Sequence, residues 1–294
     1  PWSNWNNYKL HFVIRFSKPF AQLNGWNEGV EKDDIQSIAG KNDIGAYAIY
    51  STTEGESITV STGLSLVSIE QARLNMDTEL APLQYDFDRV VAQTRNKWNE
   101  LLGRIEVEGT NEVDKTKFYT TLYRAYAGKQ TWNDVNGQYR DACENIQQLD
   151  HGNMYGGDAF WNSFWNLNGL WSIISPRIVD DWVTTQLEMF KHTGWTSKGP
   201  AVLEYSGIME GSHETALMVA AYQKGIRKDG EAIYEAVLKN VTETGIDHPC
   251  GGSCGNPLLD VYIKQGYMPM EKGVVSKTLD YAYDDWCVSQ LALA

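Results

Sequence analysis

The sequence has no run of about 18 consecutive apolar residues, which is the length that a membrane-spanning helix requires. It is also poor in positive charge, since 25 lysine and arginine residues stand against 38 aspartate and glutamate residues, for a net charge of −13. Such an excess of negative charge repels a phosphate backbone. These two shortages indicate no membrane span and no nucleic-acid partner.

Cysteine is scarce as well, because four cysteines are too few for a disulfide framework in a chain of 294 residues. Cys250 and Cys254 lie in one short glycine-containing loop, where we expect them to form a disulfide. A zinc site is the alternative, but it needs further thiolate or imidazole ligands, and only His248 lies close by. We expect Cys143 and Cys287 to be free and partly buried.

Several short motifs are absent: the sequence has no phosphate-binding loop, no dinucleotide fingerprint and no Ser-His-Asp order. Recognisable ends are absent too. The chain opens at Pro1 without an initiator methionine, and residues 291–294 continue a helical pattern without a stop signal. We expect both ends to be cuts within a longer protein, so that a missing leader carries no information.

The first 80 residues have the pattern of a β-sheet. One face of the opening strand is expected to be buried, and it consists of alternate apolar residues: Tyr8, Leu10, Phe12, Ile14 and Phe16. Val13 is the one apolar residue on the opposite face. Further strands are expected at 44–50, 57–61 and 64–69, separated by turn residues, and together they predict the remnant of a β-sandwich.

From about Asp86 the apolar period becomes helical. Val90, Thr94, Trp98 and Leu101 recur at helical spacing and Gly103 follows as a stop, which predicts a connecting helix. The rest of the chain indicates successive helices with loops, typical of a helical toroid. One of these helices should begin near Pro176, and another, over 216–222, is apolar all round and should be fully buried.

Aromatic residues are abundant, with 11 tryptophans and 16 tyrosines. Their flat apolar faces with polar edges suit stacking on sugar rings, although core packing must account for most of them. The count alone is therefore a weak sign of a carbohydrate site.

Two acidic residues stand out in the predicted helix over 275–291, for which Ser276 is a plausible N-cap. Its buried stripe is expected to contain Leu279, Tyr283, Trp286, Cys287 and Leu291. Asp280 and Asp284 lie one turn apart on a neighbouring stripe, where like charges cost roughly 0.2–0.5 kcal/mol. Two interpretations stay open: carboxylates that favour the helix N-terminus, or a carboxylate pair at a sugar-binding site.

Polar residues also gather in the loop that leads into the predicted buried helix, namely Glu204, Glu210, His213 and Glu214. A glycine-containing loop at the mouth of a helical barrel suits ligand binding. The other interpretation is that Ser212 or His213 caps the helix and Glu214 complements its dipole, which for Glu214 alone is the favoured one.

The chain resembles the family 92 glycoside hydrolases. Five blocks carry this resemblance in the family's order: 115–124, 134–140, 160–163 with 174–176, 209–213 with 221–225, and 276–286. The similarity also covers 8–19 and 67–74. It implies an α+β multidomain fold, in which a partial β-sandwich (1–80) and a linker helix (81–110) precede the first part of an (α/α)6 barrel (111–294).

The resemblance further implies a calcium-dependent, inverting α-mannosidase that acts on terminal α-mannosides of glycans and is secreted, periplasmic or on the cell surface. Its acid would be Asp280. The sugar contacts would be Trp161, Asn162, Glu210, His213 and Asp284. The metal ligands are unknown, and most of them, with the general base, are expected beyond Ala294, so that residues 1–294 alone would be inactive.

The sequence departs from the family's pattern in ways that mark a divergent member. Asp280 stands where the family has a glutamate, Asn162 stands where it has an aspartate, and the Gly-Asn-Glu-Thr block is replaced around 204–206. The alternative function is therefore a catalytically impaired glycan-binding protein that kept the cleft. Paired acidic residues in the downstream base motif would favour the enzyme.

Overall fold

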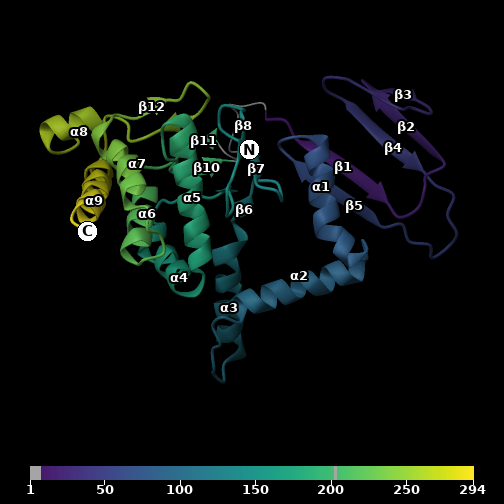
Figure 1. Ribbon diagram of the computed structural model, residues 1–294, viewed down its shortest axis with the longest axis horizontal. Coiled ribbons are helices and arrows are strands. Elements are labelled where there is room, and N and C mark those ends of the chain that lie inside the picture. The colour runs from purple at the N-terminus through teal and green to yellow at the C-terminus, as the bar shows by residue number, and fades with distance from the viewer. Residues whose placement is uncertain (1–7, 202–203) are drawn as a thin grey trace.

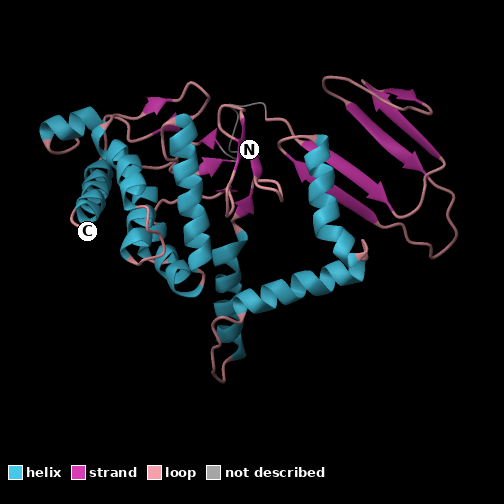
Figure 2. Cartoon of the chain, in the orientation of Figure 1, coloured by secondary structure: helices cyan, strands magenta, loops and turns pink. Residues whose placement is uncertain are grey.

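The computed structural model describes residues 8–201 and 204–294. Figures 1 and 2 show a β-sheet region, a long connecting helix and a helical region, in that order along the chain. This is the α+β arrangement that the sequence predicted, with sheets first and helices after them.

Five strands form two antiparallel sheets in the N-terminal region, with strand orders β1-β5 and β3-β2-β4. Their bounds are β1 (His11–Phe16), β2 (Gln22–Asn27), β3 (Val30–Lys32), β4 (Ile44–Ile49) and β5 (Val60–Ser65). The strands predicted at 57–61 and 64–69 are thus one strand, and the polar strands β2 and β3 were not predicted.

The face of β1 that packs against the protein is the opposite of the expected one. Val13 is buried with Ala72 and Met76 of helix α1 (Ile69–Leu80), whereas Phe12 and Ile14 are exposed. Gly63, the partner of Val13 across the sheet, has no room for a side chain because a Cβ would lie 2.1 Å from the Ala72 carbonyl oxygen. This glycine lets α1 approach the Val13 face closely.

Helix α1 itself was not predicted, although the sequence contains its start signal. Ser68 is its N-cap, and the Ser68 side chain accepts a hydrogen bond from the Gln71 backbone N–H at 3.2 Å. A serine followed three residues later by glutamine is the pattern of a capping box.

The connecting helix α2 (Phe87–Leu102) matches its prediction. Asp86 caps it by accepting from the Arg89 N–H at 2.9 Å, and Gly103 ends it. In Figure 1, α2 runs between α1 and α3 (Glu112–Ala127).

The main core lies in the helical region. Further helices are α4 (Leu167–Ile174), α5 (Pro176–Thr193), α6 (Glu214–Gln223), α7 (Gly230–Thr242), α8 (Leu259–Gln265) and α9 (Val275–Ala292), with 3-10 turns at Ala81–Leu83 and Ser163–Trp165. Helix α5 starts at Pro176 as predicted, and α6 is buried over most of its length as predicted. Helix α6 packs against α5, α7 and α9 (Figure 1). No helix in the described part of the chain is long and apolar enough to cross a membrane.

Short two- and three-residue strands form hairpin-like pairs beside these helices. They are β6 (Gln130–Thr131), β7 (Gln138–Arg140), β8 (Ile146–Gln148), β9 (Tyr155–Gly156), β10 (Pro200–Ala201), β11 (Glu204–Tyr205), β12 (Ile246–Asp247) and β13 (Ser253–Cys254). They pair as β6-β9, β7-β8, β10-β11 and β12-β13.

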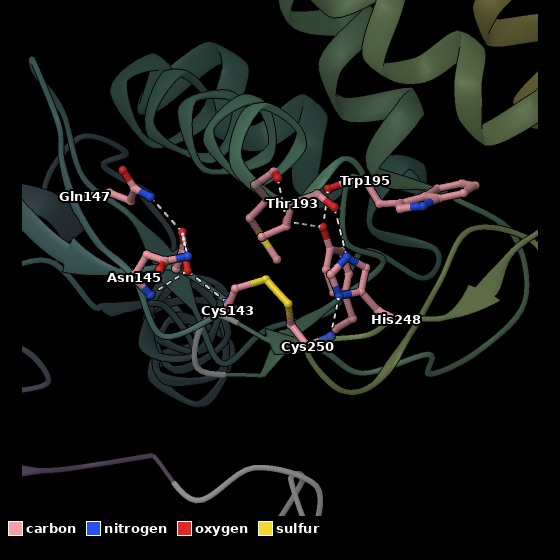
Figure 3. Close-up of a disulfide and its surroundings, with 10 residues drawn as sticks. Cys143, Asn145, Gln147, Thr193, Trp195, His248 and Cys250 are labelled. Carbon is pink, nitrogen blue, oxygen red and sulfur yellow. Dashed lines mark hydrogen bonds between the residues drawn. A yellow bond between two sulfur atoms is a disulfide. The ribbon is translucent and has the colours of Figure 1, made fainter.

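A disulfide joins Cys143 to Cys250, which are 107 residues apart (Figure 3). The predicted loop disulfide between Cys250 and Cys254 is therefore wrong, as is the free Cys143. Cys254 and Cys287 are free and buried, so the prediction holds for Cys287. The error arose because the pairing depends on a tertiary contact between two distant loops, which sequence spacing does not reveal.

Candidate active site

The loop before α6 contacts the two aspartates of α9. The Ser212 backbone N–H donates to Asp284 Oδ2 at 2.7 Å, and His213 Nε2 lies 3.6 Å from Asp280 Oδ1. One short segment therefore contacts two carboxylates that are one helical turn apart. The candidate residues Asp280, Asp284 and His213 come together in space.

The orientation of α9 differs from the expected one. Cys287 and Leu291 are buried as predicted, but Leu279 and Trp286 are exposed, and Asp284 is completely buried. The helix begins at Val275 without a side-chain cap, so the predicted N-cap at Ser276 is wrong. Since no acidic residue lies in the first turn of α9, the helix dipole does not explain this aspartate pair.

Only one carboxyl oxygen of Asp284 has hydrogen-bond partners in the described part of the chain. Its Oδ2 accepts from the Ser212 N–H and from Asn256 Nδ2 at 3.2 Å, whereas Oδ1 has no hydrogen-bond partner among the described residues. Burial raises the pKa of this carboxyl group to about 8, which favours its protonated form near neutral pH.

Glu214, the first residue of α6, has a similar environment. Its Oε1 accepts from Thr196 Oγ1 at 2.8 Å and from Asn240 Nδ2 at 3.3 Å, while Oε2 has no hydrogen-bond partner in the described chain. Burial raises the pKa of Glu214 to about 7. The dipole role expected for Glu214 fits its place in the first turn, but not its complete burial.

Lys198 is a buried cation that the sequence analysis missed. It is 6% exposed, and its charge acts on Glu214, Asp284 and Glu210. Burial lowers the pKa of its amine, and the carboxylates oppose that shift. Nothing in the local sequence Ser197-Lys-Gly199 marks this lysine as buried, because the residues around it, such as Glu214 of α6 and Asp284 of α9, are distant in the sequence.

The turn at 160–165 supplies the next two candidate residues. Asn162 has φ +62°, and its backbone N–H donates to His213 Nδ1 at 3.2 Å. The turn is anchored to Lys198, whose carbonyl accepts from the Phe160 N–H at 3.0 Å. Trp161 is 48% exposed, so part of its indole face is open to a ligand.

The two remaining glutamates of the loop lie in different surroundings. Glu210 forms an ion pair with Lys277 of α9 at 3.6 Å, which brings it to the same helix as Asp280. Glu204 is buried in β11, where it pairs with Ala201 of β10.

Comparison with known proteins assigns the family. A model of the glycosyl hydrolase family 92 catalytic domain matches residues 71–294, and a model of that family's N-terminal domain matches residues 1–65. The chain belongs to glycosyl hydrolase family 92.

Similar solved structures include a family 92 inverting mannosidase of Bacteroides thetaiotaomicron, at 28% identity and a TM-score of 0.84, covering 98% of this chain and 38% of that one. A family 92 α-mannosidase of the same organism is 25% identical with a TM-score of 0.83, covering 96% and 38%. An uncharacterized secreted glycosidase of Arthroderma benhamiae is 24% identical over 80% of this chain and 27% of its own length. The chain thus spans well under half the length of these relatives.

Two sizeable cavities of this family 92 chain lie away from Asp280. One of about 820 Å³ lies between β5, α1 and the loops at 131–137 and 149–153, and one of about 760 Å³ lies beside the start of α7 and the end of α9. The candidate site around Asp280 is partly open, since the Asp280 side chain is 21% exposed.

The described residues do not provide a calcium cage made of acidic side chains. The one group of three or more His, Cys, Asp or Glu side chains close enough to share an ion, among those described, is Cys143, His248 and Cys250. Two of these are joined in the disulfide, and calcium prefers oxygen ligands. His248 is also engaged, because Nε2 lies 2.9 Å from the Thr193 carbonyl and Nδ1 accepts from the Cys250 N–H (Figure 3).

Proposed function

We propose that the full-length protein is a glycosidase that removes terminal α-mannose from glycans with inversion, with Asp280 as its general acid. The observation that carries the proposal is the position of Asp280 in a family 92 catalytic domain. Its carboxyl group is partly exposed and burial raises its pKa, opposed by Lys198. A raised pKa keeps a carboxylic acid protonated until it is needed as a proton donor.

The other candidate residues divide by exposure. Trp161 is exposed, and Asn162 and Glu210 are partly accessible, so we assign direct sugar contacts to these three. Asp284 and His213 are buried, so we assign them a structural role: Asp284 anchors the loop at Ser212, and His213 lies against Asp280. An inverting site also needs a second carboxylate roughly 6.5–9.5 Å from the acid, with water between them. We expect that general base in residues beyond Ala294.

The decisive experiment is Asp280→Asn in the full-length protein, assayed on two α-mannosides with different leaving groups. For methyl α-mannoside, whose leaving oxygen needs a proton, kcat/KM should fall about 10²- to 10⁴-fold. For 2,4-dinitrophenyl α-mannoside, which leaves without protonation, the loss should be less than about tenfold. Asp285→Asn is the matched control, because Asp285 is the same residue type on α9 but accepts from Tyr262 Oη at 2.9 Å.

Proton NMR of the first sugar released tests the stereochemistry, since inversion yields β-mannose from an α-mannoside. Calcium dependence is a separate prediction, and full activity after exhaustive chelation would contradict it. If the wild-type protein binds mannosides in calorimetry but releases no sugar, the glycan-binding function is favoured instead. That alternative is motivated by the natural residues Asp280 and Asn162, which stand where the family has glutamate and aspartate.

We also propose that the protein works in an oxidising compartment, secreted, periplasmic or at the cell surface. The Cys143–Cys250 disulfide supports this, because such bonds persist mainly outside the cytosol. The Arthroderma benhamiae relative is described as secreted. Fractionation of the source cells followed by immunoblotting would test the location.

A further inference from the structure

We propose that His213 is a positioning residue that fixes the orientation of the Asp280 carboxyl group, so that the acidic proton is carried by the oxygen that faces the substrate. This inference rests on the proposed function, in which Asp280 is the general acid.

The His213 ring is held in one orientation. Its side chain is 1% exposed, and Nδ1 accepts the Asn162 N–H at 3.2 Å. Phe164 packs edge-on against the ring at a centroid distance of 5.0 Å, and Tyr283 does so at 6.3 Å. Turning the ring over would therefore leave the Asn162 N–H without its acceptor inside a packed site.

The hydrogen bond to Nδ1 also fixes the tautomer. A neutral imidazole has one acceptor and one donor nitrogen, so a ring that accepts at Nδ1 must carry its hydrogen on Nε2. The ring is neutral under ordinary conditions, because burial and the charge of Lys198 lower the pKa of His213 to about 4. His213 therefore presents an N–H group on the side of Asp280.

This N–H has no hydrogen-bond partner in residues 8–201 and 204–294, although it is buried. The carboxylate recorded beside it is Asp280, with Oδ1 at 3.6 Å from Nε2, slightly beyond a hydrogen bond. Catalytic hydrogen bonds are often long without substrate and shorten in the complex. A shift of a few tenths of an ångström would form this one.

Gly211 provides the space for that contact. Its φ is +72°, and a Cβ at this position would lie 2.6 Å from His213 Nε2 and 3.0 Å from Asp280 Cβ. A side chain here would separate the ring from the carboxyl group. The backbone of the loop is thus shaped to let His213 and Asp280 meet.

The chemical consequence concerns which oxygen holds the proton. When Oδ1 accepts from the histidine N–H, it acts as the carbonyl oxygen of the acid, and the proton is carried by Oδ2. As the C1–O bond breaks, that proton passes to the leaving oxygen, and the N–H stabilises the carboxylate left on Asp280. The attacking water bonds to C1 and gives its proton to the general base.

Two substitutions in the full-length protein distinguish the role of His213 Nδ1 from that of Nε2. His213→Asn keeps an acceptor for the Asn162 N–H but removes the donor to Asp280, whereas His213→Gln places an amide N–H near the position of Nε2. We expect His213→Asn to lower kcat/KM at least about tenfold on methyl α-mannoside and less than about threefold on the dinitrophenyl mannoside, and His213→Gln to recover most of the loss. An equal loss on both substrates in both variants would show a merely structural role and overturn the proposal.

Crystal structures of the wild-type, His213→Asn and His213→Gln proteins provide a readout that does not depend on activity. We expect Nε2 within about 3.2 Å of Asp280 Oδ1 in the wild type when a mannoside analogue is bound, and a rotated carboxyl group in His213→Asn with or without the analogue. An unchanged Asp280 in His213→Asn would refute the coupling. Should the wild-type protein cleave no α-mannoside, the proposed function fails, but the structures still decide whether His213 orients Asp280.

Discussion

Two groups of buried carboxylates in this molecule differ in their hydrogen bonding, and the first group consists of Asp141 and Asp134. Near the disulfide, Asp141 accepts at Oδ1 from the Cys143 and Asn145 N–H groups and at Oδ2 from the amides of Gln147 and Asn145 (Figure 3). Between the β-sheet region and the helical region, Asp134 accepts from Ser65 Oγ at 2.9 Å and from Asn75 Nδ2 at 2.7 Å. In both cases each carboxylate oxygen has a donor.

The cluster behind Asp280 shows the opposite arrangement. Asp284 and Glu214 each have two donors on one oxygen and no hydrogen-bond partner for the other within the described chain. A buried polar atom without a partner costs about 1–3 kcal/mol of stability, so the unpaired oxygens of Asp284 and Glu214 are a cost to the fold. We propose that Asp141 and Asp134 hold the framework, whereas Asp284 and Glu214 belong to the candidate site around Asp280.

Breaking the Cys143–Cys250 disulfide tests how strongly the framework around Asp141 is held, and it should have the largest effect on the free energy of unfolding. The bond closes a loop of 107 residues, and removing it should cost about 4 kcal/mol of unfolding free energy. Guanidinium denaturation of the full-length protein with and without reductant measures the loss. The Cys143→Ala, Cys250→Ala double variant should match the reduced wild type and ignore reductant. Stability that is the same with and without the bond would show that these loops do not need it.

Removing the carboxylate at the junction of the two regions should have a somewhat smaller effect. Asp134→Ala leaves Ser65 Oγ and Asn75 Nδ2 without their acceptor, at a cost of about 3 kcal/mol. The matched control is Asp150→Ala, because Asp150 is exposed and lines the same cavity. The same denaturation experiment compares them. If both variants lose equally little, Asp134 does not hold the two regions together.

Sequence patterns predicted those parts of the fold whose signals are local. The connecting helix α2 has its cap at Asp86, its period and its stop at Gly103 within 18 consecutive positions of the chain, and α6 is apolar over 216–222. The capping pattern Ser68 to Gln71 was equally local and could have predicted α1.

Two other failures share one physical cause, which is that the deciding partner is distant in sequence. Cys143 pairs with a cysteine from another loop, and the exposed side of α9 depends on how α6 and α7 pack against it. Among the candidate site residues, the sequence analysis named Asp280, Asp284 and His213, which the fold brings together, but not Lys198. No local pattern shows that a lysine between serine and glycine is buried among carboxylates.

The pH dependence of stability is the most direct test of the partly unpaired carboxyl groups of Asp284 and Glu214. Burial raises the pKa of Asp284 from 3.8 to about 8, so between these values the unfolded chain releases a proton that the folded chain keeps. Its contribution to stability is therefore complete below about pH 4 and is lost as the pH rises toward 8, by at most about 1.4 kcal/mol per pH unit. Glu214, with its pKa raised to about 7, changes stability in the same direction.

Asp284→Asn keeps an oxygen for the Ser212 N–H and cannot ionise, so it should remove the Asp284 part of this dependence. From pH 5.5 to pH 7 the wild type should lose about 2 kcal/mol of unfolding free energy more than the variant does. Guanidinium titrations of the full-length proteins at both pH values measure the difference, with Asp285→Asn on the same helix as the control. Parallel pH profiles for the wild type and Asp284→Asn would mean that Asp284 is ionised in the folded protein. Its open oxygen would then have a charged partner such as Lys198, and the cluster behind Asp280 would be as fully paired as the framework.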